Sequence, residues 1–177
     1  TVAVAVNAQA ADWFAPDARW QATVTLRRGL NRLLVRALDA DGNEVAQQYA
    51  DVWHGDAPAR SLGQRLTQSA RWTAARPLLV VKPLVVPADV TLTVDPGATI
   101  CFGPEGRLLI EGQFLAEGDA QRRIQFLRTP GIAGAWGGIG FSDSAINNRI
   151  AHVDFHHTGS YALAITNSVV TLDHVQW

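Results

Sequence analysis

Sulfur-containing residues are almost absent from this sequence: its 177 residues include a single cysteine, Cys101, and no methionine. One cysteine cannot form an internal disulfide, and it cannot supply the several thiolates of a cysteine-based zinc site. The chain must therefore obtain its stability from a packed core. The lack of disulfides does not exclude secretion, because a large repeat protein can be secreted without them.

Long apolar runs and an excess of one charge are missing as well. No stretch approaches the roughly 18 apolar residues of a membrane span, and the first residues lack the charged and apolar regions of a signal peptide. The formal net charge of -1 is evenly spread, so no basic stripe offers itself to nucleic acid. Hydrophobic residues make up 47% of the chain and charged residues 18%, which predicts a folded protein. We therefore expect no membrane span and no nucleic-acid partner.

Residues 1–53 alternate apolar and polar side chains in short stretches that are separated by turn residues. These stretches predict strands at 2–6, 20–26, 31–38 and 45–53. Gly29 and the segment 39–43 lie between strands, and this spacing is typical of a β-sandwich. Asp39 also begins a calcium-loop-like pattern, but its Gly42 comes two positions early and position twelve is Ala50, so a hairpin turn is favoured.

A longer pattern covers the middle of this region. It reads Trp20-x-x-x-Val24-x-Leu26-x-x-Gly29-x-Asn31-x-Leu33-x-Val35-x-Ala37-x-Asp39-x-x-Gly42-Asn43. The pattern resembles bacterial immunoglobulin-like modules that are related to the B domain of glucodextranase. The resemblance implies a spacer module without catalysis. We expect the module to be incomplete at its N-terminus, because a full sandwich would need one or two strands before Thr1.

An internal repeat begins after residues 54–77, which form the predicted linker that leads into a second region. From residue 78 short apolar triplets alternate with turns. Three pairs of segments carry the repeat: Ile150-x-His152-Val153-x-Phe155 and Leu172-x-His174-Val175-x-Trp177 at an offset of 22, Ile139-x-Phe141 and Leu163-x-Ile165 at 24, and Ile124-x-Phe126 ahead of the Ile150 strand by 26. Such a repeat predicts a solenoid in which successive turns stack strand on strand.

Further segments of this region share glycines at the expected corners. They are Asp95-Pro96-Gly97 with the strand that follows, 107–118 and Trp136-Gly137-Gly138-Ile139, and the strand 148–155 comes after them. Together they resemble the right-handed parallel β-helix of pectin-lyase-like bacterial secreted proteins. The resemblance implies a fold but no activity, because the family includes adhesins, lyases, hydrolases and stalks. It also implies a secreted or cell-surface location.

The expected fold class is thus all-β. An immunoglobulin-like β-sandwich module at 1–53 is followed by the linker at 54–77 and by the first turns of a right-handed parallel β-helix at 78–177. We expect this β-helix to be truncated at the C-terminus. Its last turn would then lack a neighbour, so self-association through the open end of the solenoid is expected.

Candidate binding residues gather near the end of the chain. His152, Asp154 and His156 alternate with apolar residues, so they are expected to share one outer face of a strand. His174 is expected to stack one turn away from His152. Alternate residues of a strand can reach one metal ion. A solvated polar face is nevertheless favoured, so no metal and no cofactor is expected, and the four residues form a candidate glycan-binding patch.

Catalytic groups are not identified. The carboxylates of glycoside hydrolysis must converge within about 5 to 9.5 Å, and only Asp154 and Asp173 are plausible neighbours. The offset of 22 pairs Asp154 with Gln176 and Asp173 with Ala151, so these acids are not stacked. The Gly-x-Ser-x-Gly motif and phosphate-binding loops are missing. No catalytic residue is assigned.

Two functions remain for the sequence. The leading one is a non-enzymatic structural, adhesive or glycan-binding segment of an extracellular multidomain bacterial protein, with a polysaccharide or cell-surface glycan as its partner. The alternative is the N-terminal part of a polysaccharide lyase or glycoside hydrolase whose catalytic turns lie beyond residue 177. Asn147, Asn148 and Asn167 are expected to stack their amides in a structural ladder, and Trp136 is expected at a corner of a turn.

Overall fold

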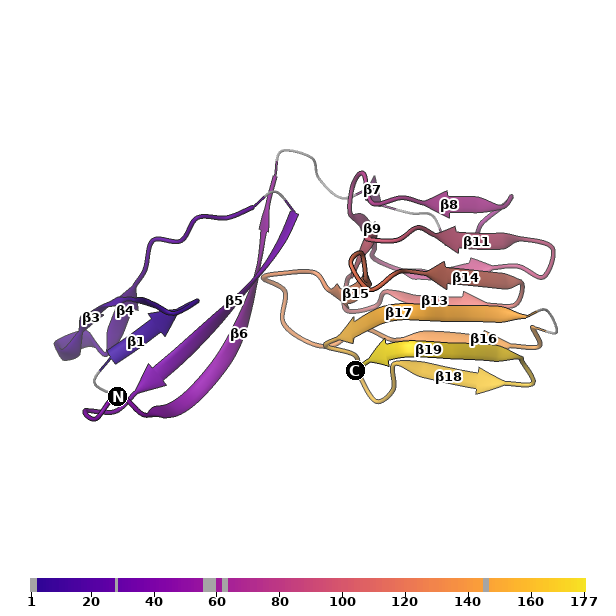
Figure 1. Cartoon of the computed structure of the whole chain (residues 1–177). Helices are drawn as coiled ribbons and strands as arrows, with labels where there is room; N and C mark the ends of the chain where they lie inside the picture. Colours follow the sequence, from indigo (N-terminus) through magenta and orange to yellow (C-terminus); the bar gives the residue numbers. More distant parts are fainter. Residues whose placement is uncertain (1–2, 28, 56–59, 62–63, 145–146) are drawn as a thin grey trace. The chain divides into compact units, whose positions relative to one another are not determined.

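The computed structural model describes residues 3–27, 29–55, 60–61, 64–144 and 147–177. Within these residues the only helix is a 3-10 turn, η1 (Ala15–Asp17), and the other regular elements are β-strands (Figure 1). The described residues contain no helix that is long and apolar enough to cross a membrane. The all-β prediction is confirmed. Contacts divide the chain into two compact units, Thr1–Asp56 and Ala57–Trp177.

The first unit contains a four-stranded antiparallel sheet in the order β2-β1-β5-β6 and a separate β3–β4 hairpin. Its strands are β1 (Ala3–Val6), β2 (Gln9–Ala10), β3 (Asp12–Phe14), β4 (Arg19–Gln21), β5 (Gly29–Leu38) and β6 (Glu44–His54). The strand predicted at 20–26 ends at Gln21, because its partner β3 is only three residues long. The result is a β-sheet with a hairpin, a coarser description than the expected immunoglobulin-like sandwich.

The turn between β5 and β6 is the hairpin that the sequence predicts. The Asp39 carboxylate accepts hydrogen bonds from the backbone N–H groups of Asp41 at 3.0 Å and Asn43 at 2.8 Å. These bonds, with that of Asn43 the strongest, hold the pKa of Asp39 below its ordinary value. Gly42 has a φ of +83°, which glycine adopts without steric cost. The carboxylate thus closes the turn instead of starting a calcium loop.

The second unit is a parallel β-solenoid of about four turns. All of its paired strands run parallel, and successive turns lie on top of one another (Figure 1). The strands are β7 (Arg60–Ser61), β8 (Ala70–Trp72), β9 (Leu78–Val80), β10 (Pro83–Val86), β11 (Thr91–Val94), β12 (Thr99–Phe102), β13 (Arg107–Ile110), β14 (Gln113–Glu117), β15 (Ile124–Arg128), β16 (Ile139–Ser142), β17 (Asn148–His156), β18 (Leu163–Thr166) and β19 (Val170–Gln176). The parallel pairs begin ahead of residue 78, since β7 pairs with β9 and β8 with β11.

The ladders define three faces around the core. One sheet follows the order β10-β13-β16-β18, and the other runs β7-β9-β12-β15-β17-β14-β11-β8 with β19 beside β17. β17 joins two faces, because its first half pairs with β14 and its second half with β15. β17 therefore bends in its middle.

This bend corrects one of the three predicted offsets. Ile150 pairs with Leu172 and Ile139 with Leu163, which confirms the offsets of 22 and 24. Ile124 pairs with Val153, three residues beyond Ile150, so the offset is 29 and the expected 26 is wrong. The error arose because one continuous strand supplies two faces, and the Ile124 strand stacks on the second half.

The core is a column of apolar side chains from the stacked strands β8 to β19. Four buried aromatic rings stack near its centre, and Phe102 and Trp136 are closest, with ring centroids 4.0 Å apart and planes 11° apart. Phe126 and Phe155 continue the stack at 5.4 Å, and Trp177 lies over Phe155 at 5.2 Å. Burying each of the four rings inside the core stabilises the fold by roughly 1.5–3 kcal/mol, and Trp177, which is 67% exposed, contributes less. The solenoid is thus held together along its axis.

The corners between faces require unusual backbone conformations. Five non-glycine residues in the described part of the solenoid adopt the left-handed region: Asp143 (φ 55°), His152 (φ 48°), His157 (φ 58°), Asn167 (φ 44°) and His174 (φ 48°). Asn, Asp and His tolerate this region better than other residues with a side chain. Gly112 meets a different demand, because a Cβ there would overlap the carbonyl oxygen of Pro87. Backbone geometry therefore restricts which residue types can occupy these corners.

Candidate functional site

The predicted patch at the end of the chain divides into two groups at the bend of β17. The ladder to β19 pairs Ala151 with Asp173 and resumes at Val153, and it leaves out His152. The left-handed conformation of His152 reverses the alternation of side chains at this point. His152 therefore does not share a strand face with Asp154, which corrects the expectation of one common outer face.

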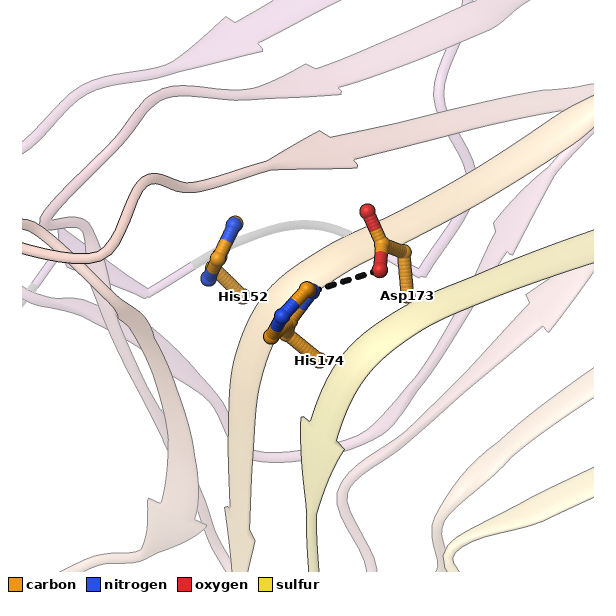
Figure 2. Close-up of side chains that lie close together, drawn as sticks. All are labelled: His152, Asp173 and His174. Atoms are coloured by element: carbon orange, nitrogen blue, oxygen red, sulfur yellow. Dashed lines mark hydrogen bonds and ion pairs between the residues drawn. The ribbon is translucent and has the colours of Figure 1, made fainter.

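The first group is a corner formed by His152 and His174 from successive turns. Their rings stack with centroids 4.5 Å apart and planes 16° apart (Figure 2), which confirms the predicted stacking. Asp173 lies beside them, and its Oδ1 is 2.6 Å from Nδ1 of His174. One possible ligand atom from each of the three residues lies within 4.8 Å of the others. We call these three residues the histidine corner.

The second group surrounds Asp154, which is a buried acid with 7% of its surface exposed. Its Oδ1 accepts a hydrogen bond from Nε of Arg123 at 2.7 Å, and its Oδ2 accepts one from Nε2 of Gln125 at 2.5 Å. Arg123 also donates to the backbone oxygen of His174 at 2.8 Å. A buried carboxylate needs such partners, because losing water without them is costly. Asp154 thus acts in packing and is not presented to solvent.

His156 belongs to the network of Asp154. Its Nε2 lies 3.1 Å from Oε1 of Gln125, so Gln125 connects the two predicted residues. The backbone oxygen of His156 accepts a hydrogen bond from Nε1 of Trp136 at 2.9 Å. His156 is half-buried. Its side chain contacts Gln125 and its backbone contacts Trp136, so His156 connects the outer network with the aromatic core. The four residues proposed from the sequence therefore form a corner pair, His152 and His174, and a second pair, Asp154 and His156, that Gln125 connects.

The sequence reasoning missed three members of these groups, Asp173, Arg123 and Gln125. Asp173 was considered only as a partner for Asp154, although it directly precedes His174 and this adjacency was a signal for a joint site. Arg123 was missed because it lies 31 residues before Asp154, and only the register of β15 against β17 brings the two together. The predicted lack of stacking between Asp154 and Asp173 is confirmed, because the ladder pairs Asp154 with Gln176.

A groove of about 630 Å³ lies at the other end of the solenoid, in its first turn. Arg65, Arg71 and Arg76 line it, together with the segment 66–70. Arg71 pairs with Asp95 at 2.8 Å, and Arg65 lies 3.8 Å from Glu111. All three guanidinium groups belong to exposed residues. The groove therefore offers three exposed guanidinium groups to an anionic ligand, two of which also have a carboxylate of the chain nearby.

The two groups and the groove differ in the chemistry that they allow. The histidine corner combines imidazole nitrogens with a carboxylate, which suits a cation, whereas the groove suits anions. Asp154, near the bend of β17, is hydrogen-bonded to Arg123. Glycoside hydrolysis uses two converging carboxylates, and Asp154 is not paired with a second one. Comparison of the chain with protein-family models, with curated proteins and with solved structures gave no match.

Proposed function

We propose that this chain is a non-enzymatic structural segment of an extracellular bacterial protein, in which a rigid β-solenoid displays a surface that binds polysaccharide. The observation that carries the proposal is the unbroken column of core side chains beneath parallel ladders that extend from β8 to β19. A solenoid of this kind gives an extended and regular surface. The proposal includes a right-handed, pectin-lyase-like β-helix and an immunoglobulin-like spacer as its two parts.

The groove in the first turn favours an acidic glycan as the ligand. Arginine side chains bind carboxylates through paired hydrogen bonds, and uronic acids carry one carboxylate per sugar. Three arginines within one groove match a chain of such sugars better than a neutral glycan. The proposed partner is therefore an acidic polysaccharide of the cell surface or its surroundings.

The test measures binding and turnover of polygalacturonate by the same protein. We expect binding at low ionic strength that weakens with salt, because exposed charges are screened. We expect no release of reducing or unsaturated ends. The double substitution Arg65→Ala and Arg76→Ala should weaken binding several-fold, and Arg149→Ala, an exposed arginine outside the groove, should not. Turnover by the purified chain would contradict the proposal and favour the alternative of a lyase or hydrolase.

Self-association through the last turns stays a prediction. β18 and β19 lie at the edges of their sheets, and Ile165, Leu172 and Trp177 are 48%, 44% and 67% exposed. Exposed apolar strands with unpaired backbone groups promote association between chains. We expect the 177-residue protein to form oligomers in light scattering at micromolar concentration. A sharp monomer under these conditions would contradict this prediction.

A further inference from the structure

The histidine corner holds three metal-binding groups from two successive turns of the solenoid. His152 comes from β17, and Asp173 and His174 come from β19. His174 has an exposed side chain, 68% accessible, and Asp173 is 44% accessible. A cation can therefore reach the corner from solvent without disturbing the core. Figure 2 shows the two parallel rings with the carboxylate beside His174.

A neighbouring corner shows what a purely structural pair looks like in this fold. Asp143 and Asn167 also occupy left-handed positions in successive turns. Their side chains bond each other directly, since Nδ2 of Asn167 donates to Oδ1 of Asp143 at 2.8 Å. His152 makes no such bond within the part of the chain that the structure describes. The backbone requirement alone thus does not account for two imidazoles and an adjoining carboxylate at one corner.

We propose that His152, Asp173 and His174 bind one Zn²⁺ ion, which ties β17 to β19. Two imidazole nitrogens and one carboxylate oxygen are a ligand set that suits zinc, and water completes the tetrahedron. Ca²⁺ prefers a shell of oxygen ligands, so a site with two imidazole nitrogens disfavours it. The ligand set differs from the one considered from sequence, because Asp173 takes the place of Asp154 and His156.

The geometry requires a small adjustment of exposed side chains. Ligand atoms around tetrahedral zinc lie about 3.3 Å apart, so atoms now up to 4.8 Å apart must approach by about 1.5 Å. Rotation of the side chains supplies this movement, because the three residues lie outside the core cluster. The ion takes the place of the proton between Nδ1 of His174 and Oδ1 of Asp173. In a neutral imidazole that proton moves to Nε2, and in a doubly protonated imidazole it leaves to solvent, so the ring that binds the ion is neutral in both cases.

The positive charge of Arg123, which contacts the backbone of the corner, does not oppose the ion strongly. Arg123 reaches the backbone oxygen of His174, but its guanidinium is paired with Asp154, with a shortest nitrogen–oxygen distance of 2.6 Å. The ion pair keeps the charge of Arg123 largely compensated on this side of the corner. The corner itself contributes one carboxylate, so zinc binding leaves a small net charge there.

The experiment is a calorimetric titration of the full chain, without a histidine tag, with Zn²⁺ and in parallel with Ca²⁺. We expect one zinc per chain at micromolar affinity and little calcium binding. His152→Asn, His174→Asn and Asp173→Asn should each weaken zinc binding at least about tenfold. Asn keeps the left-handed backbone of the two corner histidines accessible.

The matched control is His157→Asn. His157 is an exposed histidine with the same left-handed backbone, φ 58°, outside the histidine corner. Saturating zinc should raise the melting temperature by about 5 °C in the native protein and in this control, and much less in the three corner variants, whose circular dichroism should stay unchanged. Absence of micromolar zinc binding, equal binding of calcium, or equal loss in the control and the corner variants would overturn the proposal.

Discussion

Replacing Trp136 with alanine is expected to lower the free energy of unfolding of the solenoid unit by about 4 kcal/mol. Trp136 is 1% exposed and stacks on Phe102, with Phe126 and Phe155 also in contact with its ring system. The substitution leaves a large cavity in the aromatic column. It also removes the Nε1 hydrogen bond to the backbone oxygen of His156. Both losses act on the folded state alone.

Urea unfolding followed by far-ultraviolet circular dichroism measures this effect. The control is Trp177→Ala, because Trp177 is 67% exposed and stacks on Phe155 from one side only. We expect a loss of about 1 kcal/mol there, since most of that ring already faces water. Similar losses at both positions would show that Trp136 does not hold the column together.

Replacing Asn148 with alanine is expected to cost about 3 kcal/mol, although Asn148 lies at the start of a strand and carries no charge. Asn148 is fully buried. Its Oδ1 accepts a hydrogen bond from the backbone N–H of Phe114 at 2.8 Å, and its Nδ2 donates to Oγ of Ser144 at 2.8 Å and to the backbone oxygen of Val169 at 3.0 Å. Alanine would leave the buried backbone N–H of Phe114 without this partner and would remove one hydrogen bond each from Ser144 and Val169, which keep their bonds to the backbone oxygen of Gly112 and to the backbone N–H of residue 148.

Thermal and urea unfolding of Asn148→Ala should therefore show a clear loss, and Asn147→Ala provides the control. Asn147 is the adjacent residue of the same type and is exposed. Its substitution should change stability by less than about 0.5 kcal/mol. If the two variants were equally stable, the bridge from Asn148 to the neighbouring turns would be energetically unimportant.

The bonds of Asn148 also show how far the predicted amide ladder was correct. Asn148 does connect turns, since its partners Phe114 and Val169 lie on either side of β17. Asn167 instead bonds Asp143 and, as the main cause, holds the pKa of that carboxyl below its ordinary value. The expected stack of amides is thus replaced by separate bonds, because Asn148 points inward and Asn167 occupies an exposed corner.

The solenoid and its inward-facing residues were predictable from the sequence. Alternation of apolar side chains identified Val153 and Phe155 as core residues, and both are buried. The repeat of 22 residues placed His174 over His152. The inward-facing residues follow from the two-residue alternation of a strand, and the 22-residue repeat contains no insertion. Both can therefore be read directly from the sequence.

Only the tertiary structure decided which residues meet across turns with longer loops. Leu108 pairs with Ile139 at an offset of 31, and Leu115 pairs with Arg149 at an offset of 34, and no local pattern encodes these values. The insertions let Trp136 enter the core instead of staying at a corner.

The candidate site also depends partly on features visible in the sequence and partly on the tertiary structure. Sequence alone determined that histidines and acids gather near the last strands, because residue types and a short repeat are visible in the chain. The left-handed bend at His152 determined that Asp173 joins the histidines, while Asp154 turns to Arg123. The left-handed conformation of one residue depends on the packing of the whole core, and so does the strand register across a long loop. Both are therefore visible only in the folded chain.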